Sequence, residues 1–252
     1  AIPVFWSLLP QKGCSGPEDR IVLMEKFLNL KDPRTIQALV MDREFIGPEW
    51  LAYLNLKGVC FHVRLRNNIK IGRGKGEIVS AAHTFSHLQK LEKIDLPGKR
   101  TIGGKKGNMR LFVSAARSSD SDLVIVACNK DQPSSLERYK SRWGIETLFG
   151  CLKTRGFCLE DTHLTDPQKI AHLLMPLTLT FFWAFRVGLW LHEVKEIKLK
   201  KHGRKAISFF RLGLEALVKA PKKLTKWLLS IFFETCPKTP PPLSLLTSLG
   251  LL

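Results

Sequence analysis

The chain has few acidic residues for its size. Its 252 residues include only 22 Asp and Glu against 40 Lys and Arg, which leaves a net charge of +18 and a pI of about 9.9. A folded protein with this excess of positive charge is expected to bind a polyanion, nucleic acid first and an anionic membrane surface as the alternative. The 44% of apolar residues argues against wholesale disorder.

The six cysteines include no Cys-x-x-Cys pair, and their scatter argues against a secreted disulfide scaffold. Reduced thiols in the cytoplasm are therefore expected. The longest uncharged and largely apolar run, residues 173–185, has about 13 residues, whereas a membrane span needs about 20. It predicts a buried helix and no membrane association. The first residues show no signal-peptide pattern and are expected to form a strand, so we expect a fragment of a longer chain.

The hydrophobic pattern changes twice along the chain and predicts an α/β protein. Residues 1–57 alternate strand (1–9), helix (from the Ser15 and Glu18 capping signals to about Leu30), buried central strand (35–41) and helix (48–56). Five β-like runs separated by Gly, Asn and Pro turns follow, and then helical periodicity returns. We divide the chain into 1–57, the first part of an α/β core; 58–134, a β-rich insertion; 135–192, the second part of the core; 193–235, a basic helical region; and 236–252, a flexible tail.

Four polar residues recur at helical spacing in residues 135–157. Tyr139, Arg142, Glu146 and Lys153 would lie within about 60° of one another on one helix. A carboxylate among cations can bind a divalent metal ion, and the cations and the phenol can hold phosphate oxygens beside it. The alternative is a solvated helix face on which Arg142 and Glu146 form an ordinary ion pair.

Asp42 ends the expected buried strand, the position where open α/β sheets place ligands and catalytic groups. The alternative is a carboxylate that caps the next helix. Two carboxylates, one at a strand end and one on a late helix, with β structure between them, are an arrangement used for two-metal phosphoryl transfer.

These residues resemble the DDE transposases of bacterial insertion sequences, in particular the "insertion sequence four" family. The family signature Tyr-x2-Arg-x3-Glu-x6-Lys is matched by Tyr139, Arg142, Glu146 and Lys153, and the MDREF segment resembles the motif of the second Asp through Asp42. Similar text also occurs in residues 1–13, 159–167 and 200–214. The resemblance covers about residues 1–217.

The resemblance implies a ribonuclease-H-like fold, a mixed sheet with helices on both sides and a β-rich insertion. It implies two Mg²⁺ ions, replaceable by Mn²⁺, with Asp42 and Glu146 as the second and third carboxylates, and Tyr139, Arg142 and Lys153 as contacts to transposon-end DNA. The family's first Asp lies on a strand upstream of the segment that begins this chain. We therefore expect an N-terminally truncated and inactive transposase. The insertion also has no Trp to trap a flipped base, as some relatives have.

A second basic feature lies near the C-terminus. Residues 195–226 hold 11 Lys or Arg against two Glu and predict a basic amphipathic helix. We expect its Lys200, Lys201, Arg204 and Lys205 to contact the DNA backbone, with a solvated charged face or membrane-surface binding as alternatives.

Three functions stay open on this evidence. The first is a cut-and-paste transposase that acts in the bacterial cytoplasm at the nucleoid, as a homodimer on double-stranded terminal-repeat and target DNA. The second is an inactive remnant that only binds DNA. The third is a plain nuclease of the same fold, which would lack the basic region.

Overall fold

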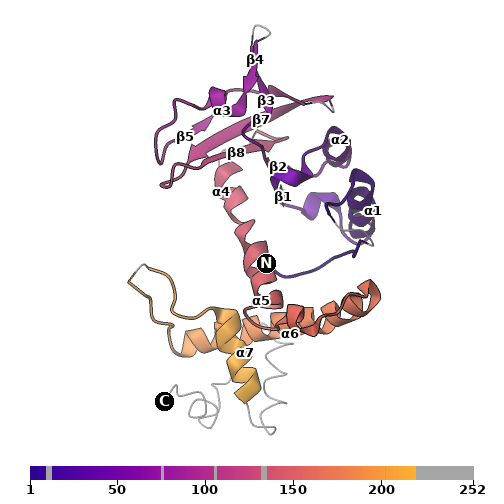
Figure 1. The fold of residues 1–252 in the computed structure, drawn as a ribbon, viewed down its shortest axis with the longest axis vertical. Helices are drawn as coiled ribbons and strands as arrows, with labels where there is room; N and C mark the ends of the chain where they lie inside the picture. The colour runs from indigo at the N-terminus through magenta and orange to yellow at the C-terminus, as the bar shows by residue number, and fades with distance from the viewer. Residues whose placement is uncertain (10–12, 75–76, 105–106, 132–134, 202, 220–252) are drawn as a thin grey trace. The chain divides into compact units, whose positions relative to one another are not determined.

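The computed structural model describes residues 1–9, 13–74, 77–104, 107–131, 135–201 and 203–219. The chain divides into two compact units (Figure 1). The sheet unit is Phe5–Gly144, and the helical unit is Ile145–Leu252 together with Ala1–Val4. The mixed α/β class expected from the sequence is confirmed. The tail predicted for residues 236–252 lies outside the described residues, and the five-segment division stays a prediction.

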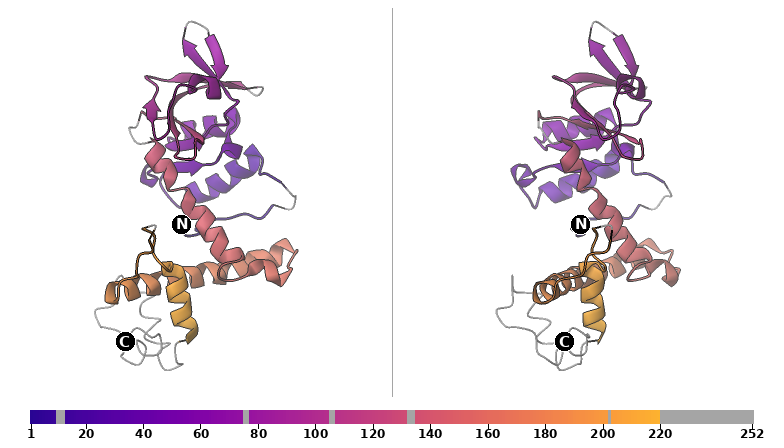
Figure 2. Two further views of the ribbon diagram at one scale, coloured as in Figure 1. Left: turned by 60° about the vertical axis from the view of Figure 1, so that its left-hand side comes forward. Right: turned by 90° about the vertical axis from the view of Figure 1, so that its left-hand side faces the viewer.

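The sheet unit is built on an eight-stranded open sheet in the order β1-β2-β8-β7-β6-β3-β4, with β5 paired to β7 (Figures 1 and 2). β1 and β2 are parallel, and the other pairings are antiparallel. All five β-like runs predicted from the sequence form strands. The strands are β1 Leu39–Met41, β2 Phe61–Arg64, β3 Lys70–Gly74, β4 Glu77–Ser80, β5 Lys93–Asp95, β6 Arg100–Gly104, β7 Gly107–Arg117 and β8 Leu123–Cys128.

The helices α1 Pro17–Leu28 and α2 Pro48–Leu56 begin and end close to their predicted bounds. Both have Pro at the first helical position, where a missing N–H costs nothing. At the start of α1 the Gly16 N–H donates to Asp19 at 2.8 Å, so Asp19, and not the predicted Glu18, satisfies the free donor. A one-turn helix, α3 Ala81–Thr84, follows β4.

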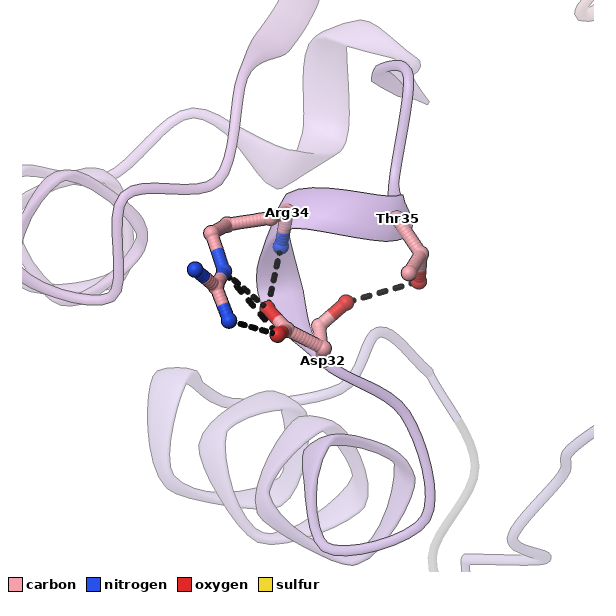
Figure 3. A network of polar contacts seen from close by, with 3 residues as sticks. All are labelled: Asp32, Arg34 and Thr35. Carbon is pink, nitrogen blue, oxygen red and sulfur yellow. Dashed lines mark hydrogen bonds and ion pairs between the residues drawn. The ribbon is translucent and has the colours of Figure 1, made fainter.

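The strand predicted over residues 35–41 is shorter than expected and stands at an end of the described sheet path. Its first residue, Thr35, belongs instead to the 3₁₀ turn η1 Pro33–Thr35 (Figure 3), and residues 36–38 form no strand. Asp32 accepts hydrogen bonds from the backbone and guanidinium of Arg34, and Thr35 Oγ1 donates to the Asp32 carbonyl at 2.7 Å. The Arg34 guanidinium lowers the pKa of Asp32 to about 2. Local side-chain hydrogen bonds thus hold Thr35 in the turn. The strand predicted for residues 1–9 is also wrong, since no strand forms there.

Alternation along the strands divides the sheet into two faces. On one face, Met41 of β1 and Phe61 and Val63 of β2 belong to the main hydrophobic cluster, to which α1 and α2 contribute Met24 and Trp50 among others. The opposite face is covered by α4 Ser135–Lys140, whose Leu136 and Tyr139 pack on Val126 of β8.

The helical unit holds most of α5 Trp143–Lys153, the turn η3 Leu159–Thr162, and the helices α6 Pro167–Val194 and α7 Phe209–Lys219. Its core includes Phe181 of α6 stacked on Phe210 of α7, with ring centroids 5.0 Å apart. α6 is long and apolar enough to cross a membrane by length and composition alone. The prediction that residues 173–185 are buried holds for Phe181 but not for Met175, which is 62% exposed.

The predicted basic amphipathic helix is only partly correct. α7 begins at Phe209, and its Phe210 and Leu214 pack into the core of the helical unit. Before α7, Leu199 and Lys205 form an isolated antiparallel bridge. Residues 220–226 lie outside the described residues.

α6 and α7 approach closely at two glycines. A Cβ on Gly213 would overlap the carbonyl oxygen of Ala184, and one on Gly188 would overlap that of Phe209. We expect Gly213→Ala to lower the free energy of unfolding by about 1–3 kcal/mol, because a packed core cannot absorb the added methyl group. Thermal or urea denaturation measures this. Val218→Ala, at a position of α7 that is 77% exposed, should leave stability nearly unchanged. Equal effects of the two changes would contradict this account of the packing.

Candidate functional site

Asp42 lies directly after β1, where its carboxylate caps a short turn and is partly exposed to solvent. Its Oδ1 accepts the Arg43 N–H at 2.8 Å and so begins the 3₁₀ turn η2 Arg43–Phe45. The side chain is 37% exposed. Asp42 therefore caps the turn η2 and not the predicted helix over residues 48–56, whose N-cap is Gly47. Its carboxylate stays partly accessible to a ligand.

Tyr139 brings α4 to this carboxylate. Its ring is 5% exposed and packs with Val126 and Leu136. Its hydroxyl donates to Asp42 Oδ1 at 3.4 Å, so the phenol is fixed at one end by hydrophobic packing and meets the carboxylate at the other. Burial raises the pKa of Tyr139, while Arg142 lowers it. The phenol therefore stays protonated and acts as a hydrogen-bond donor at neutral pH.

Arg142 follows α4 and faces the same carboxylate. Its Nη1 lies 3.8 Å from Asp42 Oδ2, and its side chain is 12% exposed. The guanidinium also stands over the ring of Tyr139, 5.6 Å from the centroid. A guanidinium held between a carboxylate and an aromatic face loses little entropy when it binds a phosphate oxygen. The structure thus brings together Asp42, Tyr139 and Arg142 of the predicted site.

Arg64 is a site residue that the sequence analysis missed. It ends β2, the strand parallel to β1, and Met41 pairs with Val63 in that register. Asp42 and Arg64 therefore follow equivalent positions at the carboxyl ends of two neighbouring parallel strands. Arg64 also lowers the pKa of Tyr139 electrostatically. The sequence does carry a signal for Arg64, because it is a charged residue at the end of the apolar run that follows the one ending at Asp42.

A cavity of about 470 Å³ opens beside Arg64. Its lining is polar and cationic and consists of Arg43, Arg64, Leu65, Arg66, Asn67 and Asn68. Three guanidinium groups and two amides offer many hydrogen-bond donors and only two side-chain acceptors, the amide oxygens. The chemistry of this cavity suits an anion such as a phosphodiester.

The single helix predicted for residues 135–157 is wrong, because α4 and α5 are separate helices. Ser141 Oγ donates to the Arg138 carbonyl at 2.7 Å, and the Arg142 N–H donates to the Tyr139 carbonyl, an i→i−3 pattern. A Ser that bonds back to the preceding turn, together with Gly144, breaks the α-helical hydrogen-bond ladder. The four signature residues therefore do not lie on a single helix: Tyr139 is on α4, Arg142 follows it, and Glu146 and Lys153 are on α5.

Glu146 and Lys153 belong to the helical unit. Glu146 is exposed in the first turn of α5. Lys153 forms an ion pair with Glu160 at 3.5 Å, both side chains being 55% exposed. The roles predicted for these two residues stay predictions.

The basic turn before α7 presents its cations to solvent. Lys200, Lys201, Arg204 and Lys205 are all exposed. The Lys200 N–H donates to the Arg204 carbonyl at 2.8 Å, which closes the turn. Lys205 packs over the ring of Phe209, with its Nζ 4.6 Å from the ring centroid. This contact within the protein makes Lys205 less available to DNA. Lys200 and Lys201 are therefore the better candidates for DNA contacts.

The oxygen donors of Asp42 and Glu146 are of the type that Mg²⁺ prefers. One carboxylate with a guanidinium 3.8 Å away makes an incomplete site. Within the described residues of the sheet unit, no three carboxylates gather closely enough to hold an ion. Ligands from elsewhere, including DNA phosphates, would have to complete the coordination.

The family model described as "Transposase DDE domain" matches residues 19–183 of the chain. A comparison with curated proteins found no match. The matched range includes Asp42, Tyr139, Arg142, Glu146 and Lys153.

The chain has two tyrosines, so titration of their phenols tests the burial of Tyr139 at the candidate site. Burial raises the pKa of Tyr53 to about 12, with Glu25 adding to the effect, and raises that of Tyr139 above its ordinary 10.0. We expect ultraviolet titration to show less than half of the phenols ionised at pH 10 in the folded protein, and normal titration in denaturant. In Tyr53→Phe the remaining signal reports Tyr139 alone.

A raised pKa in the folded state has a stability consequence of known sign. The contribution of the two phenols is fully present below pH 10 and is lost as pH rises through the folded-state values. The free energy of unfolding should therefore fall above pH 10. An ordinary titration of the Tyr53→Phe variant would contradict the burial of Tyr139.

Proposed function

Since the chain belongs to the transposase DDE domain family, we propose that it is the transposase of an insertion sequence of the "insertion sequence four" type. It would cleave transposon ends and transfer them to target DNA by cut-and-paste chemistry on a ribonuclease-H-like fold. The observation that carries the proposal is the cluster of Asp42, Tyr139 and Arg142, a carboxylate at a strand end with a phenol and a guanidinium within 4 Å of it.

Each residue of the candidate site has a role that suits its chemistry. Asp42 and Glu146 would hold Mg²⁺, or Mn²⁺ in its place, and the bound ions would supply Lewis-acid activation of the attacking and leaving oxygens. Arg142 would orient the scissile phosphate through two N–H groups. Tyr139 donates to Asp42 and so fixes the carboxylate rotamer. Lys153 would contact the backbone of the transposon end.

The partners follow from charge. Double-stranded DNA, as terminal repeat and as target, suits a net charge of +18. Lys200, Lys201, Arg204 and Lys205 would contact its backbone outside the cleavage site. A homodimer would bring the two transposon ends together. The protein would act in the bacterial cytoplasm at the nucleoid, without membrane association.

A second candidate is a DNA-binding protein that no longer cleaves. The observation that favours it is that no group of three carboxylates gathers around Asp42 within the described part of the sheet unit. If an Asp on a strand upstream of Ala1 completes the site in the intact protein, the 252-residue chain alone binds DNA and stays inactive.

The cleavage assay separates the two candidates. We expect Mg²⁺-dependent nicking of a labelled transposon end from a version that carries the genomic sequence upstream of Ala1. Asp42→Asn and Glu146→Gln should each reduce nicking by more than about 100-fold, because even outer-shell partners of a metal cost 10–100-fold, while binding of end DNA changes little.

Asp122→Asn, at an exposed loop position between β7 and β8, is the matched control and should cleave normally. Retained cleavage in Asp42→Asn would overturn the proposed active site. Cleavage by the 252-residue chain alone would show that its own residues complete the site. DNA binding without cleavage in both versions would favour the second candidate.

The salt dependence of DNA binding tests the charge argument. Each neutralised phosphate adds about 0.9 to the slope of log K against log salt, so six contacts cost roughly three decades between 50 and 200 mM salt. We expect Lys200→Gln combined with Lys201→Gln to lower the slope by about two. Lys90→Gln, at an exposed position of the sheet unit, should have a smaller effect. A wild-type slope below about 2 would instead favour a membrane or an acidic protein as partner.

A further inference from the structure

A second set of metal-ligating side chains lies inside the sheet unit, on residues that the proposed function does not use. Cys60, His62 and Cys128 are 3%, 0% and 1% exposed. One ligand atom of each lies within 4.8 Å of those of the other two. In the part of the chain that the structure describes, they form the only group of three such side chains.

Strand register brings these residues together although they are far apart in sequence. His62 of β2 pairs directly with Cys128 of β8 in the antiparallel register, so both point to the same face of the sheet. Cys60 precedes His62 by two residues and by alternation points to that face as well. The Nε2 of His62 lies 4.0 Å from the Sγ of Cys128.

This face is the one that α4 covers, beside strands β2 and β8 in Figure 1. Ser135, the first residue of α4, is 3% exposed and forms a hydrogen bond with Cys128. The Lys130 N–H also donates to the Cys128 sulfur at 3.4 Å. Hydrogen bonds directed at a sulfur stabilise its thiolate form and are typical of the surroundings of metal-bound cysteine.

We propose that Cys60, His62 and Cys128 bind one Zn²⁺ ion between β2 and β8. Two thiolates, which are soft donors, and an imidazole, which suits transition metals, select Zn²⁺ over the hard Mg²⁺ ion, which takes oxygen ligands. Zn–S and Zn–N distances are about 2.3 and 2.0–2.1 Å, so the ligand atoms need to close in by about 1 Å or less. Such a shift is within the reach of side-chain rotation. Ser135 offers an oxygen for the fourth position.

A cysteine binds Zn²⁺ as its thiolate, so coordination requires the thiol to lose its proton. When Zn²⁺ binds, each coordinated thiol releases one proton to solvent and each sulfur forms one bond to the ion. The affinity should therefore fall as the pH is lowered.

The consequence for the fold is a crosslink next to the proposed active site. The ion would tie β2 to β8, and β2 is the strand that holds β1 and Asp42 in register. The site would be structural, because all three ligands are buried and none of them contacts Asp42 in the described contacts of the sheet unit. Zinc would then stabilise the protein without replacing Mg²⁺ in cleavage.

The test uses the full chain, purified without a metal-affinity tag, stripped of metal under reducing conditions and then given Zn²⁺ or Co²⁺ alone. We expect about one equivalent of Zn²⁺ by mass spectrometry of the metal. We also expect a thiolate-to-cobalt charge-transfer band with Co²⁺, and a rise of several degrees in the unfolding temperature with Zn²⁺.

Cys60→Ser and Cys128→Ser should each lose the band and the stoichiometric Zn²⁺. Cys151→Ser removes a buried thiol of α5, 7% exposed, and is the matched control that should keep both. A wild-type protein that binds no Zn²⁺ and gives no cobalt–thiolate band would overturn the proposal, and this measurement does not depend on the folding of any variant. Retention of the band in Cys60→Ser, or a Cys60–Cys128 disulfide in the non-reduced protein, would overturn it as well.

Discussion

The packing of α4 on the sheet is the constraint on which the candidate site depends. Tyr139 is buried against Val126 and Leu136, and this burial fixes where its hydroxyl can reach. Because Tyr139 donates to Asp42, the end of β1 and the end of α4 meet at one carboxylate. Arg142 follows within one turn and approaches the other oxygen of Asp42. A hydrophobic contact thus positions a polar site, and loss of the contact would separate the carboxylate from its phenol and guanidinium.

Periodicity in the sequence was sufficient to predict β2, β3, β6, β7 and β8 and the helix α2, because alternation and apolar runs are local signals. It missed the short strands β4 and β5. It was also sufficient to place Asp42 at a strand end. It failed where a side chain competes with the backbone. Asp32 holds Thr35, the first residue of the predicted strand, in a 3₁₀ turn. Ser141 bonds back to the end of α4, where the predicted single helix divides into α4 and α5.

Strand register was invisible from the sequence, and both kinds of missed residue depend on it. Arg64 joins the site only because β2 runs parallel to β1 beside it. Cys60 and His62 meet Cys128 only because β8 runs antiparallel to β2. The spacing of these three residues along the chain matches no known zinc motif. The two sets of ligands differ in chemistry. Asp42 offers oxygen at a strand end, whereas Cys60, His62 and Cys128 offer sulfur and nitrogen within the sheet, so Mg²⁺ and Zn²⁺ would bind at different sites.

The most direct test of the central claim is to locate the divalent metal on the polypeptide. In the upstream-extended protein bound to end DNA, Fe²⁺ replaces Mg²⁺, and ascorbate with peroxide then cuts the backbone next to the bound ion. The account predicts cuts beside Asp42 and beside Glu146, which excess Mg²⁺ suppresses and Asp42→Asn removes. Metal-dependent cuts at other positions, with none near Asp42, would contradict it.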